Sequence, residues 1–388
     1  MVSVDEARAI VREQARPLLE TESVPLAAAL GRVLFEPVVA DRDDPPFDRA
    51  LMDGYALRAE DTAGAPRALD VVGRIAAGDA DLPSIGPEEA AWINTGAPMP
   101  PGADAVIPVE RTRGEVEVLA VLAPGANVLP RASLMAAGST AAEPGRLTPE
   151  RIAVCASAGA DPVVCRRRPS VAVLATGTEL RASPGKHEIR NSNGPLLRAL
   201  FDTYEPTDLG AVGDDRAALR AALERGLASD LLVTTGGVSM GDLDLVPSTL
   251  EDLGVEILFH RILLQPGKPV LFGRHARGHV VALPGNPVSA LVCADLFALP
   301  FLAARAGHDF EAALRTVPGQ LTGAVKASPK RQRVFPCVRG DTGDVMPLPW
   351  RSSADLYTVT RGNAYMIVEI ARDLAVGEEV QCLVPERF

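Results

Sequence analysis

The sequence predicts a multidomain α/β protein, built around a domain in which helices cover a sheet of mostly parallel strands, with β-rich domains elsewhere in the chain. Length is the first observation: 388 residues exceed what one hydrophobic core usually holds, so more than one domain is expected. The second is the alternation of apolar runs with amphipathic stretches between about Ser170 and Gly307, which is typical of parallel strands joined by helices. The third is the pattern on either side of this region, where short apolar runs are separated by proline and glycine.

The first element expected along the chain is a helix over residues 4 to 16. Ser3 and Glu6 have the spacing of a capping box, apolar residues recur behind them at helical spacing, and Pro17 ends the pattern. Helical periodicity returns in LTPERIAVCASAG, where Thr148 can act as the cap. We expect this second helical segment to rejoin the first, so that one domain is assembled from separated parts of the chain.

Between these helical segments, from about Asp43 to Leu122, the sequence predicts a small β-rich domain. Apolar runs such as LDVVGRI, AAWIN and EVEVLAVL are separated there by proline and glycine clusters. Arg166–Arg168 then reads as a linker, most simply a solvated charged hinge. The tail from about Phe310 shows alternating runs such as NAYMIVEI and VQCLVPE, which predict a terminal β domain.

The charge balance excludes some classes of partner. The chain has 39 Lys plus Arg against 50 Asp plus Glu, a net charge of -11, which disfavours binding to the phosphates of nucleic acids or to anionic membranes. We therefore expect neither a nucleic-acid nor a membrane partner. An anionic substrate would need cationic side chains gathered locally.

The sequence also predicts a cytoplasmic protein with reduced cysteines. Asp5 and Glu6 stand where a signal peptide would carry positive charge, and no apolar run is expected to approach the roughly 18 residues of a membrane span. The five cysteines are scattered, odd in number and without a C-x-x-C pair. This spacing disfavours a zinc site or a redox dithiol.

The most informative segment is LLVTTGGVSMGDLD, from Leu231 to Asp244, in which a buried strand leads into a glycine turn and then into a helix. Gly236 and Gly237 let backbone N–H groups approach a ligand that a side chain would crowd, and Ser239 adds a hydroxyl donor. The start of the following helix suits a phosphate or another oxyanion.

Two aspartates in this turn, Asp242 and Asp244, complicate the phosphate interpretation because bare carboxylates repel a phosphate. Carboxylates do hold a hard divalent cation that can bridge to a phosphate, and magnesium is the natural candidate. The alternative is that both aspartates only complement the dipole of the helix.

Two more strand ends show the same arrangement. VAVLATGTEL places Gly177 and Glu179 after a strand, and VVALPGNPVSA places a Pro-Gly-Asn-Pro turn before a helix. Because open parallel sheets bind ligands at the carboxyl ends of their strands, three such turns in one predicted sheet indicate a binding site. Lys268, in LLQPGKPVLFG, stands between two prolines and is a candidate oxyanion ligand, with a lysine on a surface turn as the alternative.

Two loops of the β-rich domain are unusual. In DDPPFDRALMDGYALRAED, paired prolines precede an acidic turn in which Asp53 could present a carboxylate to a neighbouring site. In NTGAPMPPGADAV, Thr95 and Gly96 could bind a ligand. Plain turns, with the aspartate bonding its own backbone, are the competing interpretation.

Six strings follow one another in the order DDPPFDRALMDGYA, TGAPMPPGADAV, VAVLATGTEL, TTGGVSMGDLD, PGKP and LPGNPVSA. Together they resemble the molybdopterin molybdenumtransferase family, whose relatives include the gephyrin E domain. The match extends over nearly the whole chain. Single strings range from weak to strong signals, but six in sequence make the resemblance specific.

The resemblance implies a subunit of four domains and a homodimer. The domains are an elongated first domain (residues 1–42 and 138–168), a β-rich second domain (43–137), a molybdopterin-binding three-layer α/β domain with a parallel-rich sheet (169–309), and a C-terminal β-barrel-like domain (310–388). Each active site would combine the third domain of one subunit with the second domain of its partner. This would explain why Asp53 and Thr95 lie so far in sequence from the glycine turns.

The family's reaction consumes adenylylated molybdopterin and molybdate, cleaves the adenylate with a divalent cation, here expected to be Mg²⁺, and leaves molybdenum on the dithiolene sulfurs. By resemblance, the catalytic residues are Asp53, Glu179, Asp244 and Lys268, and the magnesium ligands are Glu179, Asp242 and Asp244. The substrate-binding residues are Thr95, Gly177, Gly236, Gly237, Ser239, Lys268, Pro284, Gly285, Asn286, Pro287, Ser289, Arg331 and Ser353. Lys268, Ser239, Arg331 and Ser353 among them are assigned to molybdate, an oxyanion suited to cationic and hydroxyl donors. Molybdopterin adenylyltransferase and proteins of molybdoenzyme maturation are further partners that the resemblance suggests.

The chain departs from the family pattern in two places. After GANV, where relatives usually carry an Arg-x-x-Gly-Glu-Asp run, this chain has PRASLMAAG, so Ala132, Ser133 and Leu134 stand where Gly, Glu and Asp are usual. Thr178 stands where an aspartate is common, although an acidic pair, Asp214–Asp215, is kept.

These departures leave alternatives to a molybdenum-inserting enzyme. One is a divergent paralogue that binds molybdopterin or molybdate as a carrier, scaffold or storage protein, which the loss of the acidic pair favours. Another is an adenylyltransferase acting on molybdopterin, because the third domain resembles that enzyme too. The presence of three further domains argues against the adenylyltransferase.

Overall fold

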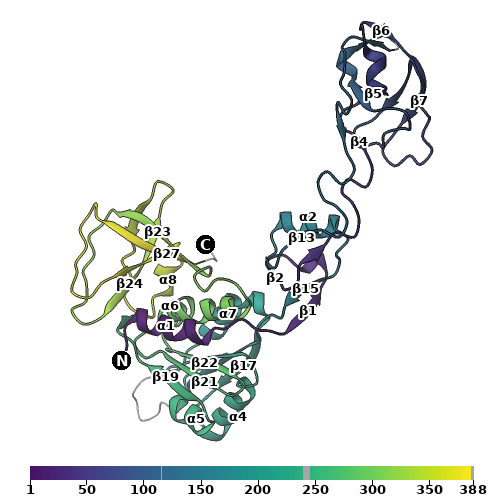
Figure 1. Ribbon diagram of the computed structural model, residues 1–388. Coiled ribbons are helices and arrows are strands. Elements are labelled where there is room, and N and C mark those ends of the chain that lie inside the picture. The colour runs from purple at the N-terminus through teal and green to yellow at the C-terminus, as the bar shows by residue number, and fades with distance from the viewer. Residues whose placement is uncertain (115, 239–244, 386–388) are drawn as a thin grey trace. The chain divides into compact units, whose positions relative to one another are not determined.

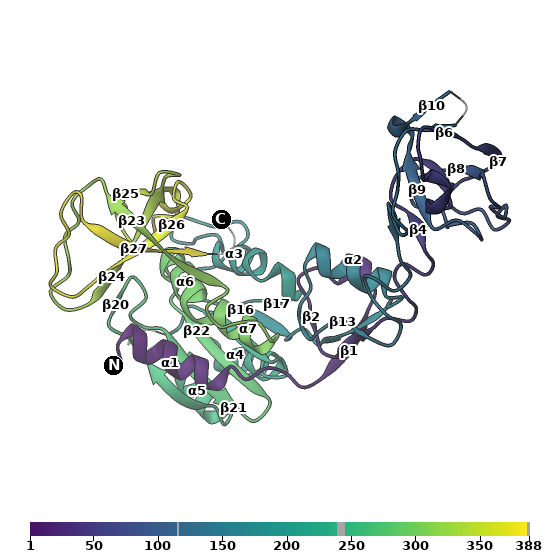
Figure 2. The same ribbon diagram turned by 45° about the horizontal axis from the view of Figure 1, so that its top comes forward.

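The structure is a computed structural model that describes residues 1–114, 116–238 and 245–385. Its contacts divide the chain into two compact units, shown in Figures 1 and 2. Unit 1 consists of Met1–Glu20 and Arg166–Phe388, and unit 2 consists of Thr21–Cys165. The first helix and the second half of the chain therefore fold together, and unit 2 is inserted between them.

The core of unit 1 is the predicted parallel-rich sheet, with six strands in the order β17-β16-β18-β22-β21-β19. The first four are parallel to one another, and the last two are antiparallel to their neighbours. The strands are β16 (Val171–Thr176), β17 (Thr207–Val212), β18 (Leu231–Thr235), β19 (Glu256–His260), β21 (Leu271–His275) and β22 (Gly278–Leu283). The predicted alternation of strands and helices is confirmed. Because β16, β18 and β22 are parallel neighbours, their carboxyl ends lie side by side.

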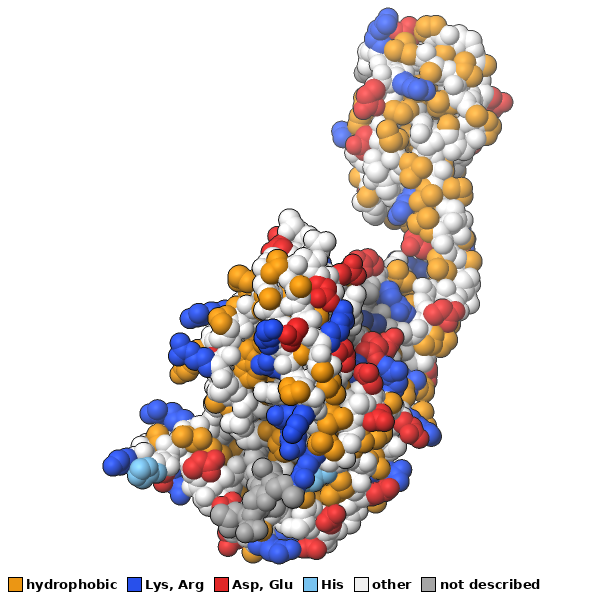
Figure 3. All heavy atoms as spheres, turned by 90° about the vertical axis from the view of Figure 1, so that its left-hand side faces the viewer, with side chains coloured by type: hydrophobic (Ala, Val, Ile, Leu, Met, Phe, Trp, Pro, Cys, Tyr) orange, Lys and Arg blue, Asp and Glu red, His pale blue; other side chains and the backbone are white. Residues whose placement is uncertain are grey.

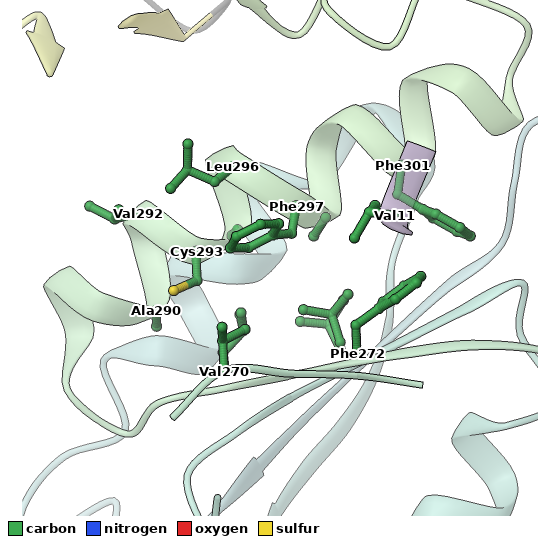
Figure 4. Close-up of a cluster of buried hydrophobic side chains, with 14 of the residues drawn as sticks. Val11, Val270, Phe272, Ala290, Val292, Cys293, Leu296, Phe297 and Phe301 are labelled. Atoms are coloured by element: carbon green, nitrogen blue, oxygen red, sulfur yellow. The ribbon is translucent and has the colours of Figure 1, made fainter. Parts of the chain in front are cut away.

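Helices cover both faces of this sheet, which makes three layers (Figures 1 and 2). Along β16, Val171 and Val173 face one hydrophobic cluster, and Ala172 and Leu174 face another. The first cluster lies under α1 (Val4–Gln14), α3 (Asn193–Leu200), α6 (Pro287–Cys293) and α7 (Leu299–Arg305), and the second under α4 (Arg216–Gly226) and α5 (Val246–Asp252). Figure 4 shows the aromatic part of the first cluster, including Phe272, Phe297 and Phe301.

The predicted capping box at the start of the chain is confirmed. The Ser3 hydroxyl accepts a hydrogen bond from the Glu6 amide, and the Glu6 carboxylate accepts one from the Ser3 amide at 2.8 Å. The second predicted helix, α2 (Pro149–Ser157), is capped by Thr148 as expected. However, α1 packs in unit 1 and α2 in unit 2, so the expectation that the two helices rejoin in one domain is wrong.

One helix contradicts the expectation that no apolar run would reach the length of a membrane span. Pro287–Arg305 is continuous over 19 residues, because α6 and α7 are joined by a π-helical turn, Ala294–Ala298, and it is apolar enough to cross a membrane by length and composition. However, 89% of its most apolar window is buried inside the protein. It is therefore the central helix of the unit 1 core.

Arg8 stabilises this helix at its irregular turn. Pro300 has no N–H, so it cannot donate to the carbonyl of Leu296, four residues earlier. Arg8 donates to that carbonyl at 2.9 Å through Nη1 and to Glu311 at 2.5 Å through Nη2. One partly buried guanidinium from α1 thus donates to a carbonyl that cannot receive the usual helical hydrogen bond from Pro300.

Replacing Arg8 by methionine is expected to lower the free energy of unfolding by about 2 to 3 kcal/mol, because the Leu296 carbonyl stays buried and loses its donor. Urea denaturation measures this loss. The matched control is Arg12→Met, since Arg12 also pairs with Glu311 and stacks on Phe310 but is 58% exposed, and it should cost less than about 1 kcal/mol. Equal losses in the two variants would contradict the role given to the carbonyl.

The C-terminal part of unit 1 is the predicted β-barrel-like domain. Its sheet has the order β20-β24-β25-β23-β27-β26, and a further pairing between β24 and β26 closes five of the strands into a ring. The strands are β20 (Leu264–Gln265), β23 (Leu314–Leu321), β24 (Gln332–Arg339), β25 (Asp344–Pro347), β26 (Ala364–Val368) and β27 (Glu379–Pro385), with a short helix α8 (Leu356–Val359). A separate apolar cluster that includes Cys337 and Cys382 fills the ring.

Unit 2 contains two small four-stranded sheets. The first, in the order β7-β8-β5-β9, comprises β5 (Gly54–Leu57), β7 (Asp70–Ile75), β8 (Glu89–Ile93) and β9 (Ala105–Pro108). The second, in the order β1-β15-β2-β14, comprises β1 (Thr21–Val24), β2 (Val33–Leu34), β14 (Gly145–Arg146) and β15 (Val163–Arg166). Shorter strands are β3 (Val38–Val39), β4 (Arg49–Ala50), β6 (Arg67–Ala68), β10 (Thr112–Arg113), β11 (Glu117–Val118), β12 (Val128–Leu129) and β13 (Thr140–Ala142).

The arginines expected to form a solvated hinge are instead anchored in unit 1. Arg167 donates to both oxygens of Asp230, at 2.9 and 3.2 Å, and Ser170 donates to the same carboxylate through its amide and its hydroxyl. Burial alone would raise the pKa of Asp230, but these hydrogen bonds outweigh it and the pKa is lowered. The carboxylate is therefore ionised, and it fixes the segment that leads back from unit 2.

His279, on β22, lies beside this junction and is held neutral. Its ring stacks on Phe272 at 5.7 Å and lies 4.9 Å from the ring of Phe301, and neither ring nitrogen has a hydrogen-bond partner among the residues described. Burial, with the nearby charge of Arg305 as a second cause, lowers its pKa to about 4.

This lowered pKa predicts a loss of stability in acid. The contribution of neutral His279 is complete above its unfolded pKa, near 6.5, and disappears as the pH falls towards 4. Between pH 7.5 and pH 5 the loss amounts to about 2 kcal/mol. Urea unfolding at both pH values should show this difference in the wild type and a smaller one in His279→Phe, which keeps the stacked ring but cannot titrate. An unchanged pH dependence in the variant would show that other groups cause it.

Candidate active site

Three loops meet at the carboxyl edge of the unit 1 sheet. The register pairs Ala175 of β16 with Thr235 of β18, and Thr235 with Leu283 of β22, so the three strands end at the same level. Gly177, Gly236 and the Pro284–Ser289 segment follow directly. The structure therefore brings together the three turns that the sequence predicts to form one site.

The glycine turn after β18 packs directly against its neighbours. Gly236 has φ +93°, and a Cβ atom on it would lie 2.2 Å from the carbonyl oxygen of Thr176. Its amide donates to the carbonyl of Leu283 at 3.0 Å. The predicted reason for this glycine is close approach of a ligand, and the structure adds a second one, close approach of the backbone of β16.

Asn193, at the start of α3, joins the loops and was missed in the sequence. Its Nδ2 donates to the Thr235 hydroxyl at 2.7 Å and to the carbonyl of Gly285 at 2.8 Å. The Thr235 hydroxyl in turn donates to the carbonyl of Pro284 at 3.0 Å, and the Thr176 hydroxyl donates to the carbonyl of Thr235 at 3.3 Å. In the sequence, NSNGPLLRALFDT signals only a helix, and nothing local marks this side chain.

Carboxylates border the loop after β16. The carboxylate of Glu179 folds back over Gly177, where a Cβ atom would lie 2.6 Å from it, and the Glu179 side chain is exposed. The Thr178 hydroxyl donates to Asp214 at 3.1 Å. Asp215 caps α4 by accepting the amide of Ala218 at 2.7 Å. Glu179 and Asp214 are therefore the acidic groups that the loops present, and Asp215 is used by the helix.

Three predicted site residues, Ser239, Asp242 and Asp244, lie outside the described residues. Within the described part of the chain, no group of three or more His, Cys, Asp or Glu side chains is placed to hold a metal ion. The predicted magnesium ligand that the structure describes is Glu179.

Lys268 lies in a tightly packed turn. A Cβ atom on Gly267 would lie 2.6 Å from Sγ of Cys293, a residue of α6, and the Lys268 carbonyl accepts the amide of Ile262 at 2.9 Å. The Lys268 side chain itself is exposed. The backbone of this lysine is thus fixed while its ammonium group faces solvent.

The C-terminal domain contributes its predicted residues next to these elements. The amide of Gln332 donates to the carbonyl of Leu263, and β24 pairs with β20, the strand that precedes Lys268. Arg331 therefore lies in the segment that runs beside β20. The amide of Val288 donates to the carbonyl of Ser353 at 3.0 Å, so Ser353 lies at the first turn of α6, beside Pro287 and the buried Ser289.

The chain as a whole carries a net charge of -11, and Lys268 and Arg331 are the cationic side chains that the sequence predicts for the site. Figure 3 shows Lys and Arg side chains interspersed with Asp and Glu on one face of unit 1. An anionic substrate would therefore depend on individual cationic side chains such as Lys268.

Asp53 and Thr95 form a second group, in unit 2. Oδ1 of Asp53 accepts the Thr95 amide at 2.7 Å and the Thr95 hydroxyl at 3.1 Å. These bonds lower the pKa of Asp53 and keep it ionised. A Cβ atom on the next residue, Gly54, would lie 1.9 Å from the carbonyl oxygen of Ile107, so the turn is tightly packed. The aspartate bonds a residue far along the chain, and the plain-turn interpretation is wrong.

Four large apolar side chains are exposed on unit 2. Phe47, Leu51 and Met52 are each more than 40% exposed, and Leu134 is 60% exposed. The loop that carries Leu134 is held by Arg131, which pairs with Asp43 at 2.6 Å. We call these four side chains the unit 2 apolar residues.

Comparisons with known proteins point to molybdopterin-related proteins over most of the chain. Residues 2–159 match the family model described as the MoeA N-terminal region (domain I and II), and residues 172–304 match a probable molybdopterin binding domain. A molybdopterin molybdenumtransferase 2 of Mycobacterium tuberculosis is 39% identical over 77% of this chain and 78% of its own length. The molybdopterin molybdenumtransferase of Bacillus subtilis is 36% identical over 73% of this chain and 70% of its own length. The crystal structure of a molybdopterin biosynthesis MoeA protein from Pyrococcus horikoshii superposes with a TM-score of 0.82 at 30% identity, covering 99% of both chains.

Proposed function

Because the chain belongs to the molybdopterin molybdenumtransferase family, and so is an enzyme that inserts molybdenum into molybdopterin, we propose that it does so by consuming adenylylated molybdopterin and molybdate with cleavage of the adenylate. Water attacks the P–O–P bond between the molybdopterin phosphate and AMP, so that AMP leaves and the phosphate stays on molybdopterin. Molybdate loses one oxygen as water, formed with the two thiol protons, when molybdenum binds the two dithiolene sulfurs. Mg²⁺ held by carboxylates of the site would assist the cleavage.

The observation that supports the proposal most is the convergence of three glycine-bearing loops at the carboxyl ends of β16, β18 and β22. Exposed Gly285 and Asn286 and the partly exposed Gly237 provide a backbone surface on which a flat pterin and its phosphates can lie without side chains intervening. Lys268, Arg331 and Ser353 belong to segments paired with these elements, and they provide cationic and hydroxyl donors for molybdate.

The acidic groups at this edge fit a hard divalent cation. Magnesium in enzymes is usually held by one or two carboxylates together with substrate phosphates and water. Glu179 and Asp214 supply two carboxylates on neighbouring loops, and Asp242 and Asp244 are the further ligands proposed from the resemblance. Bound there, Mg²⁺ would neutralise charge on the phosphates at the scissile bond.

We propose further that the protein is a homodimer in which Asp53 and Thr95 of one protomer complete the loops of the other. The hydrogen bonds from Thr95 keep Asp53 ionised, and the unit 2 apolar residues are large hydrophobic side chains of the kind that protein interfaces cover. We expect the dimer to work in the cytoplasm, where molybdopterin adenylyltransferase and proteins of molybdoenzyme maturation would be its partners.

Release of AMP tests the reaction. Purified protein incubated with Mg²⁺, molybdate and adenylylated molybdopterin should release AMP, measured by chromatography, and release should stop when EDTA removes the metal. The relative from Mycobacterium tuberculosis serves as the positive control. No release by this chain under conditions in which the relative is active would overturn the proposal.

The alternative, a carrier that binds molybdopterin or molybdate without turnover, has one observation in its favour. Leu134 exposes an apolar side chain where relatives carry an acidic one. In the same assay, a carrier would retain adenylylated molybdopterin after gel filtration and release no AMP.

A further inference from the structure

We propose that Asn193 is a positioning residue for the pterin substrate: its amide group ties the end of β18, at Thr235, to the loop after β22, so that Gly236 and this loop keep the spacing at which they bind the pterin. The substrate named here rests on the proposed function. The bonding arrangement rests on unit 1 alone.

The contacts of Asn193 show how one side chain sets the spacing of two loops. It is 7% exposed, and its Nδ2 donates at 2.7 Å to the Thr235 hydroxyl and at 2.8 Å to the carbonyl of Gly285. The Thr235 hydroxyl in turn donates a hydrogen bond to the carbonyl of Pro284. A Cβ atom on Gly285 would lie 3.6 Å from Cα of Gly236, so the two loops touch where Asn193 bonds them.

A role in capping α3 does not account for these bonds. A different residue supplies the side-chain bond at the start of that helix, because Oδ1 of Asn191 accepts the Gly194 amide at 2.9 Å. The acceptors of Asn193 lie 42 and 92 residues further along the chain. Helix α3 therefore uses its first turn to reach across the ends of two strands. Helix α3 also packs on the sheet through Leu197, so the hydrophobic core fixes the position of the helix that carries Asn193.

The acceptor side of the same amide points to the same role. Oδ1 of Asn193 is buried and has no hydrogen-bond partner among the residues described. A buried acceptor without a partner destabilises a fold, so this side chain is not optimised for stability. The amide supplies two donor bonds, one to the end of β18 and one to the loop after β22, and both acceptors lie at the edge of the sheet that carries the proposed site.

Steady-state kinetics separate positioning from stability. In Asn193→Ala the KM for adenylylated molybdopterin should rise about tenfold or more, because the loops lose their fixed spacing, while the KM for molybdate stays within about twofold. The control is Leu196→Ala, which removes partly buried packing from the same helix and no hydrogen bond, and should leave both KM values unchanged. A KM for the pterin that is unchanged in Asn193→Ala, or raised equally in Leu196→Ala, would overturn the proposal.

The variant Asn193→Asp supplies a readout that a structural role would not move. A protonated carboxyl has one donor and a carboxylate has none, so the KM for the pterin should improve as the pH falls in N193D and not in N193A. The absence of any pH-dependent difference between the two variants would contradict the need for a donor at this position.

Hydrogen exchange keeps this test independent of catalysis. In the substrate-free protein, N193A should speed exchange in peptides covering 231–238 and 281–289 at least about tenfold relative to L196A. If exchange is faster in N193A but the wild-type protein releases no AMP, the proposed reaction is refuted and the positioning role is retained. Unchanged exchange would refute the positioning role even in an active enzyme.

Discussion

Replacing Gly236 by alanine is expected to weaken binding of adenylylated molybdopterin by about a hundredfold, because small displacements of binding groups have effects of this size. The added Cβ atom would lie 2.2 Å from the carbonyl oxygen of Thr176 and 2.9 Å from its hydroxyl, so the loop after β18 has to move away from β16. The backbone there has φ +93°, which adds strain for any residue with a side chain. Equilibrium binding with the purified variant measures the effect.

The matched control is Gly254→Ala. Gly254 follows α5 with φ +83°, close to the value at Gly236, but nothing lies within 4 Å of the position of its Cβ atom. This variant should lose about 1 kcal/mol of stability from backbone strain and bind the substrate as the wild type does. If both variants bind equally well, the close contact between the loops has no bearing on the site.

Two inactive variants are expected to restore activity when they share a dimer. Asp53→Asn alters unit 2, and Glu179→Gln alters the loop after β16 in unit 1; each alone should reduce AMP release at least about a hundredfold if both groups act in the reaction. In a mixed dimer with sites built from two protomers, one site combines the intact unit 1 of one with the intact unit 2 of the other. Random mixing should then restore about a quarter of the wild-type activity.

Co-expression with two different affinity tags allows the mixed dimer to be purified and assayed. Dimers of a single variant, purified in the same way, are the control and should stay inactive. A mixed dimer without activity, from variants that fold and dimerise normally, would show that Asp53 and Glu179 serve a site within one protomer or do not serve the same reaction.

Much of the fold follows from patterns within short stretches of sequence. The alternation of apolar runs and amphipathic segments predicts the sheet of unit 1, and the glycine turns predict which edge presents the loops. The capping box at Ser3 and the cap at Thr148 are local signals, and both are confirmed. Such features depend on residues a few positions apart, which a single sequence displays directly.

The features that sequence patterns do not reveal depend on residues far apart. Asn193 bonds Thr235 and Gly285, and Arg8 bonds Leu296, so neither role leaves a local trace. The apolar sequence of the helix Pro287–Arg305 does not read as a run of membrane-span length because Asp295 and Pro300 interrupt it, although the packed core accommodates both residues. The arginines before β16 look like a solvated hinge because their acceptor, Asp230, lies 63 residues from Arg167.

The closed ring of strands in the C-terminal domain has a consequence for how molecules of this protein meet. Each of the five strands in the ring is paired on both sides over part of its length, although β23 pairs with β25 only at Gln320 and Leu321. The ring therefore leaves fewer unpaired amides and carbonyls than an open sheet of the same strands would, which lowers the tendency of this domain to add a strand from a neighbouring molecule.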